Sequence, residues 1–61
     1  MLTKLKEYQK NGQNNIEFAK ECLKNMERYQ GFEDFYSSHF LVHIDHVLFW
    51  AREIKDELGR S

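Results

Sequence analysis

Histidine is the residue of this chain best suited to chemistry, and its three copies lie close together. His39, His43 and His46 fall within an arc of about 60° on one face if the segment is helical. Imidazoles at positions i and i+4 can share a zinc, nickel or copper ion, and the carboxylate of Asp45 or Glu53 is a candidate for the remaining ligand. Because His39 and His46 would lie about 10 Å apart along the axis, one ion can hardly use all three.

We therefore predict that the histidines are half-buried interface residues with hydrogen-bond partners across a helical bundle. A metal site at His39 and His43 is kept as an alternative, and pH-sensitive association through the same residues is a third reading.

No catalytic pattern accompanies these residues. Asp45 interrupts an apolar run, where a lone acid can specify the register of an oligomer. Cys22 lies on an apolar stripe and is expected to be a buried thiol. Catalysis would need a partner group and a pocket, and a small helical hairpin offers little of either. We predict no enzymatic activity and no cofactor.

The length and composition of the chain favour association. A chain of 61 residues forms one domain at most, here residues 1–61, and buries only about 60% of its unfolded surface. Its single cysteine cannot form an internal disulfide, so oligomerisation is the expected source of extra stability. A net charge of -1 supplies no field to attract nucleic acid or an acidic membrane. The lone thiol and the lack of a membrane-length apolar run favour the cytoplasm, with no membrane association.

Three glycines punctuate an otherwise helix-compatible sequence that has no proline. A short first helix is predicted over residues 2–10, broken at Asn11–Gly12. A second helix is predicted over residues 15–30, with Asn14 as its N-cap and Gly31 in the left-handed position after its end.

A long third helix is predicted to reach Leu58, with Asp34 or Ser38 as its cap. Folding about Gly31 then gives an antiparallel hairpin in which Ile16 lies near His46. The first half of the chain is net basic and the second half net acidic, so the hairpin would set opposite charges face to face. The predicted fold class is all-α: a helical hairpin with a short broken N-terminal helix, dimerising into a four-helix bundle.

The third helix carries two neighbouring apolar ridges, one of Leu41, Ile44, Leu48, Ala51 and Leu58 and one of Phe40, Val47, Trp50 and Ile54. A helix that is apolar almost all round must be covered on several sides, which one short neighbour cannot do. A homodimer is therefore predicted, with an interface of Leu41, Ile44, Val47, Leu48 and Ala51. The aromatic residues around the turn and beyond it suit a surface that anchors a partner, namely Phe32, Phe35, Tyr36, Phe40 and Trp50.

These features predict a small regulatory or interaction protein that binds another macromolecule, most readily a protein. The alternative is a nucleic-acid-binding dimer that uses the basic stripe of Lys20, Lys24 and Arg28. Glutamates three residues from these lysines, such as Glu17 and Lys20, are spaced for ion pairs that would blunt the stripe.

Overall fold

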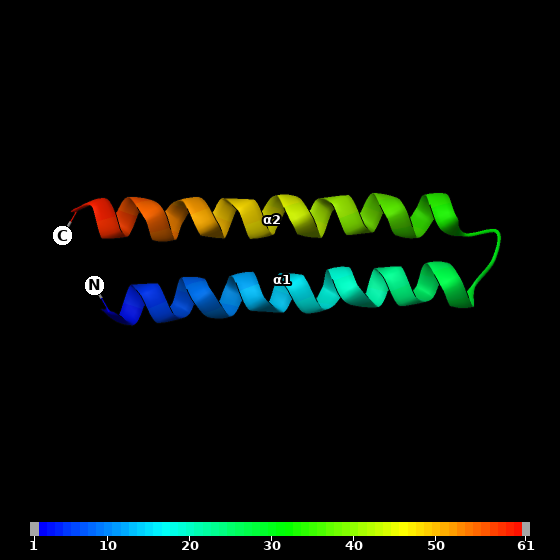
Figure 1. Cartoon of the computed structure of the whole chain (residues 1–61), viewed down its shortest axis with the longest axis horizontal. Helices are drawn as coiled ribbons and strands as arrows, with labels where there is room; N and C mark the ends of the chain where they lie inside the picture. Colours follow the sequence, from blue (N-terminus) through cyan, green and yellow to red (C-terminus); the bar gives the residue numbers. More distant parts are fainter. Residues whose placement is uncertain (1, 61) are drawn as a thin grey trace.

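The chain forms a hairpin of two long antiparallel helices, with the start of α1 and the end of α2 at the same end of the molecule (Figure 1). The structure is a computed structural model that describes residues 2–60. Helix α1 covers Leu2–Arg28 and helix α2 covers Glu33–Arg60. The Cα atoms extend over 48 × 14 × 9 Å, so the molecule is a single flat layer of two helices. The predicted all-α hairpin is confirmed over the described residues.

Helix α1 runs without interruption through the polar segment around Gly12, so the predicted short N-terminal helix is wrong. Asn14 is an exposed residue inside α1 and not an N-cap. The side-chain amide of Asn15 donates to the Asn11 carbonyl at 2.9 Å, within the helix. Gly12 lies against α2, where an added Cβ would be 3.7 Å from the Cβ of Trp50. Packing along the whole of α2 outweighs the roughly 1 kcal/mol that glycine costs in a helix interior.

The turn between the helices is organised around Gly31. Its φ of 95° is the left-handed conformation predicted for this glycine. The Gly31 N–H donates to both carboxylate oxygens of Glu33, at 3.1 and 2.9 Å, and this hydrogen bond holds the pKa of Glu33 below its ordinary 4.5. Because α2 already begins at Glu33, the predicted capping residues Asp34 and Ser38 lie inside the helix, where the Ser38 hydroxyl donates to the Asp34 carbonyl at 2.9 Å.

The two helices meet along one seam of residues spaced alternately three and four apart, as in an antiparallel coiled coil. Its members are buried or half-buried: Leu5, Tyr8, Gly12, Asn15, Ala19, Cys22 and Met26 from α1, and Tyr36, Phe40, His43, Val47, Trp50, Ile54 and Glu57 from α2. Aromatic contacts cross the seam, with the Tyr8 and Trp50 ring centroids 5.4 Å apart. The second predicted ridge of α2 is therefore the one that packs on α1.

The hairpin has only a small core. Among the described residues, Ala19 and Cys22 are the only buried apolar side chains, which confirms the predicted burial of Cys22. Glu57 is also buried and accepts from the Arg60 guanidinium at 3.2 Å. Eleven large apolar side chains in the same part of the chain remain exposed. The hairpin alone therefore leaves most of its large apolar residues in water.

Opposite charges do not join the helices in the way the sequence predicted. Over residues 2–60, both ion pairs lie inside a helix: Lys20 with Glu17 at 3.6 Å, and Arg60 with Glu57. Apolar and aromatic packing along the seam therefore supplies the contact between α1 and α2, together with hydrogen bonds from His43 and His46 to Asn15.

Candidate interaction surfaces

One flank of the hairpin is lined by aliphatic side chains from both helices. On α2, the residues that come directly after a seam residue project to one side of the hairpin. They include residues 41, 44, 48, 51 and 58. On α1, residues 2, 16 and 23 follow the same rule by their seven-residue spacing. We call this flank the leucine face and define it as Leu2, Ile16, Leu23, Leu41, Ile44, Leu48, Ala51 and Leu58.

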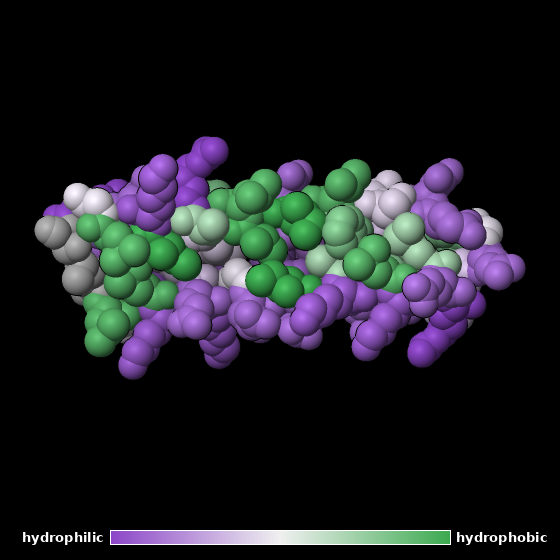
Figure 2. Space-filling view, viewed as in Figure 1, coloured by the Kyte–Doolittle hydropathy of each residue, from purple (hydrophilic) through white to green (hydrophobic). Residues whose placement is uncertain are grey.

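The leucine face is continuous and open to water. Figure 2 shows it as a hydrophobic band that runs along most of the molecule over both helices, with hydrophilic side chains along its borders and at the turn. Leu41 and Leu48 are 61% and 62% exposed, and Ile16 and Ile44 are half-buried at its centre line. Four of the five residues predicted for the dimer interface lie on this face, while Val47 lies in the seam.

The opposite flank is lined by aromatic and histidine side chains. Each of its residues comes directly before a seam residue in the sequence, so its side chain points away from the leucine face. We call this flank the aromatic face and define it as Phe18, Phe35, His39, Val42, His46 and Phe49. All six are exposed, and the rings of Phe35 and His39 are in contact with centroids 4.4 Å apart. The hairpin thus carries two apolar surfaces on opposite sides.

A polar cluster interrupts the seam near its middle. The Asn15 side-chain oxygen lies 3.0 Å from Nδ1 of His43 and 3.3 Å from Nδ1 of His46. An amide oxygen can only accept, so each Nδ1 carries the proton in these hydrogen bonds. His43 is half-buried and has a partner across the hairpin, as predicted, whereas His46 and His39 are exposed.

The geometry gives little support to the metal alternative. Nδ1 of His39 donates to the Phe35 carbonyl at 2.9 Å, and that of His43 donates to Asn15, so the two rings are held by different acceptors. Within residues 2–60, no three side chains of histidine, cysteine, aspartate or glutamate are grouped so that they could hold an ion. An ion on His39 and His43 would need water or a second chain for its other ligands.

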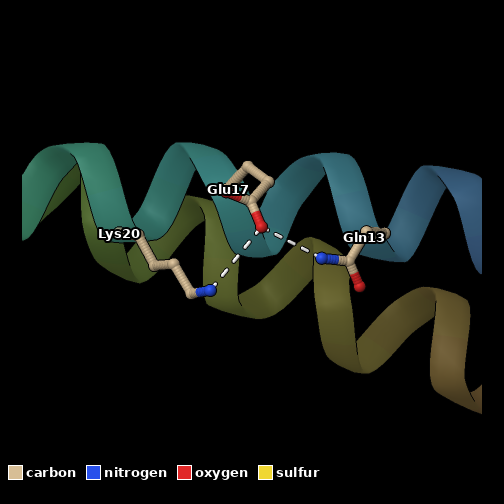
Figure 3. A network of polar contacts seen from close by, with 3 residues as sticks. All are labelled: Gln13, Glu17 and Lys20. Carbon is tan, nitrogen blue, oxygen red and sulfur yellow. Dashed lines mark hydrogen bonds and ion pairs between the residues drawn. The ribbon is translucent and has the colours of Figure 1, made fainter.

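The basic stripe of α1 is partly neutralised by its neighbours. Figure 3 shows the Glu17 carboxylate between Lys20, 3.6 Å away, and the Gln13 amide, which donates to it at 3.0 Å. All three side chains lie on the exposed side of α1. The predicted i,i+3 pair at Lys20 is therefore present, and it reduces the charge that Lys20, Lys24 and Arg28 would offer to a phosphate backbone.

The predicted partner-binding residues divide into two groups. Phe32 and Phe35 are exposed at the end of the hairpin that carries the turn. Tyr36, Phe40 and Trp50 are half-buried in the seam. The structure therefore brings only the first two to an open surface.

The sequence interpretation missed Asn15 and half of the aromatic face, namely Phe18, Val42 and Phe49. Asn15 was read as the start of a helix, although the three- and four-residue spacing from Leu5 to Cys22 places it at an inward position. The same spacing on α2 would have separated Val42 and Phe49 from the leucines beside them. The three- and four-residue spacing, continued through the polar segment around Gly12, would have identified both Asn15 and the aromatic face.

No pocket is found within residues 2–60, and neither helix is apolar enough over a sufficient length to cross a bilayer. Comparison of the chain with protein-family models, with curated proteins and with solved structures gave no significant match.

Proposed function

We propose that this chain is a small interaction protein, active in binding and not in catalysis, which works as a helical homodimer and binds another protein. One observation carries the proposal: the hairpin has two exposed apolar flanks on opposite sides. Patches of this kind on a soluble chain mark sites of association. A second copy covers one flank, and the other flank remains for a different partner.

The leucine face suits the dimer and the aromatic face suits the partner. Aliphatic residues at three- and four-residue spacing pack against helices, whereas exposed aromatic rings make up much of the energy of binding sites for other proteins. Phe35 and Phe49 are 54% and 52% exposed, and Phe32, in the turn, is 60% exposed. Binding of nucleic acid through Lys20 and its neighbours is the competing function.

Site-specific photocrosslinking in cells tests the proposal. A benzophenone amino acid is placed at Phe49 on the aromatic face, at Leu48 on the leucine face and, as a control, at the exposed Lys10, which lies on the side of α1 away from α2. We expect the probe at Leu48 to give adducts of two copies of the chain. The probe at Phe49 should give a discrete adduct with another protein, which Phe35→Ser diminishes and nuclease leaves unchanged.

Two results would contradict the proposal. Adducts at Phe49 that match the background at Lys10 would remove the partner site. Adducts that nuclease destroys, in a chain whose binding falls steeply with salt, would transfer the function to the basic stripe.

A further inference from the structure

We infer that the leucine face is covered by a second copy of this chain, with α2 packed antiparallel on α2 and α1 on α1 about a twofold axis at the level of Gly12 and Trp50. The inference rests on the homodimer of the proposed function and deepens it by naming the face, the helix pairing and the register. The area and residue pattern of the hairpin and the charges of α2 each support it.

The area that the hairpin exposes is close to what a stable dimer requires. Its accessible surface is 4963 Å², whereas a compact monomer of 7.4 kDa exposes about 4200 Å². The excess, roughly 750 Å², is close to the ~800 Å² that each partner buries in an interface of standard size. One further copy therefore brings the exposed surface per chain to an ordinary value.

The pattern of the leucine face requires an occupant made of two helices. α2 is lined by two neighbouring ridges, of which α1 fills only the one that contains Val47 and Trp50. In a four-helix bundle each helix contacts two neighbours in this way. The ridge of α2 that α1 does not cover lies on the same side of the hairpin as Leu2 and Leu23 of α1. The exposed apolar surface is therefore two helices wide (Figure 2). A second hairpin has the same width and length.

The outer border of the face decides which helices meet. On α2 the outer row contains Leu41 and Leu48. On α1 the corresponding row contains the polar Gln13 and the ion-paired Lys20 (Figure 3). If α2 packed on α1 of the other copy, Leu41 would face Lys20. If α2 packs on α2, the two leucine rows meet and the polar rows of α1 stay together at the other edge.

The register follows from the positions of the leucines. Gly12 lies level with Trp50, so one twofold axis there relates both helices to their copies. Leu41 then lies opposite Leu58 of the partner subunit, because both are eight or nine residues from the axis. Leu2 and Leu23 lie ten and eleven residues from Gly12, so they face each other in the same way across the pair of α1 helices. Two independent sets of leucines therefore agree on a single axis.

The charges beside the α2 row are complementary under the same axis. Asp45 and Lys55 lie five residues on either side of Trp50, so the axis sets Asp45 of one copy level with Lys55 of the other along the paired α2 helices. Neither makes an ion pair within the part of the chain that the structure describes. The axis also leaves the aromatic face on the outside of the dimer.

Disulfide trapping of the intact chain tests the face and the register. Every variant carries Cys22→Ala, which removes the native thiol from the buried seam. Leu48→Cys lies close to the axis, so it should form a disulfide-linked dimer about ten-fold faster than Val42→Cys, its exposed control on the aromatic face. Leu41→Cys and Leu58→Cys should each remain monomeric on a non-reducing gel when oxidised alone, and should link to each other when mixed. Circular dichroism confirms that each variant is helical, and sedimentation counts the chains before oxidation.

Each result separates the inference from the proposed function. A dimer in sedimentation that Val42→Cys traps faster than Leu48→Cys would place the interface on the aromatic face, which overturns the inference and leaves the homodimer in place. Trapping of Leu41→Cys alone, without trapping of the mixture, would overturn the register. A monomer at all concentrations would overturn both the inference and the homodimer.

Discussion

Leu48 and Phe49 are neighbours in the sequence, but the helix turns them to opposite faces of the hairpin. They are similarly exposed, at 62% and 52%, and both are apolar. Truncating each to alanine removes apolar surface from one face and leaves the other intact. Comparing Leu48→Ala with Phe49→Ala therefore asks whether association depends on the leucine face or only on the general hydrophobicity of the chain.

The exposure of Leu48 sets the size of the effect. An exposure of 62% leaves about 110 Å² of this residue in water, and burying it in a dimer is worth roughly 2.5 kcal/mol at ~25 cal/mol per Å². Alanine keeps about a third of that area, so each copy loses roughly 1.5 kcal/mol and the dimer about 3 kcal/mol. Since about 1.4 kcal/mol corresponds to a ten-fold change in affinity, the dissociation constant should rise about 100- to 1,000-fold.

Sedimentation equilibrium over a wide range of protein concentration measures both dissociation constants. Phe49→Ala should change the dissociation constant by less than about three-fold, because the proposed dimer does not bury this side chain. The helicity of both variants, measured by circular dichroism above their dissociation constants, should match that of the parent. Because phenylalanine is the larger residue, a Phe49→Ala effect equal to or greater than that of Leu48→Ala would refute the reasoning.

Three other regions of the hairpin allow independent tests by denaturant unfolding at a fixed protein concentration. Asn15→Ala removes the hydrogen-bond acceptor of His43 and His46 and should lower the free energy of unfolding by about 1–2 kcal/mol. Asn14→Ala, its exposed control, should change the free energy of unfolding by less than about 0.5 kcal/mol. Equal effects would show that the seam hydrogen bonds contribute nothing. Gly31→Ala should destabilise the hairpin by about 1 kcal/mol because the φ of Gly31 is 95°. Gly59→Ala should stabilise the hairpin by up to about 1 kcal/mol, because Gly59 lies inside α2 with open space around it. A gain in stability at both positions would contradict the turn geometry. The lowered pKa of Glu33 means that its hydrogen bond with Gly31 stabilises the turn above the ordinary pKa of 4.5, and that this stability is lost as the pH falls through the lower folded value. Glu33→Gln should abolish that part of the acid sensitivity, which a side-chain NMR titration of Glu33 checks directly, and an unshifted titration would disprove it.

Much of the fold follows from residue types and local spacing. Gly31 between two helix-forming segments predicts the turn, and the repeat of apolar residues predicts helices on either side of it. The same repeat separates the two ridges of α2, one through Leu48 and one through Trp50, because neighbouring ridges on a helix differ by a single residue. Exposure of Phe32 at the turn is also consistent with the spread of the aromatic residues there.

The continuity of α1 through Gly12 could not be predicted from local residue types and spacing. A local reading of Asn11–Gly12 favours a helix end, since asparagine and glycine are common there. The segment stays helical because its inward side packs on α2, with Gly12 against Trp50 and Asn15 bonded to His43. The partners that decide this lie about thirty residues away in the chain, outside any local window.

The sequence by itself thus determined that the chain is a helical hairpin with more apolar surface than two helices can bury. Only the tertiary structure decided which ridge of α2 meets α1 and which stays open. The reason is the size of the facing side chains: Gly12, a small residue on the inward side of α1, leaves room for the large ring of Trp50. Complementary size is a relation between residues on different helices, and spacing along either helix does not contain it.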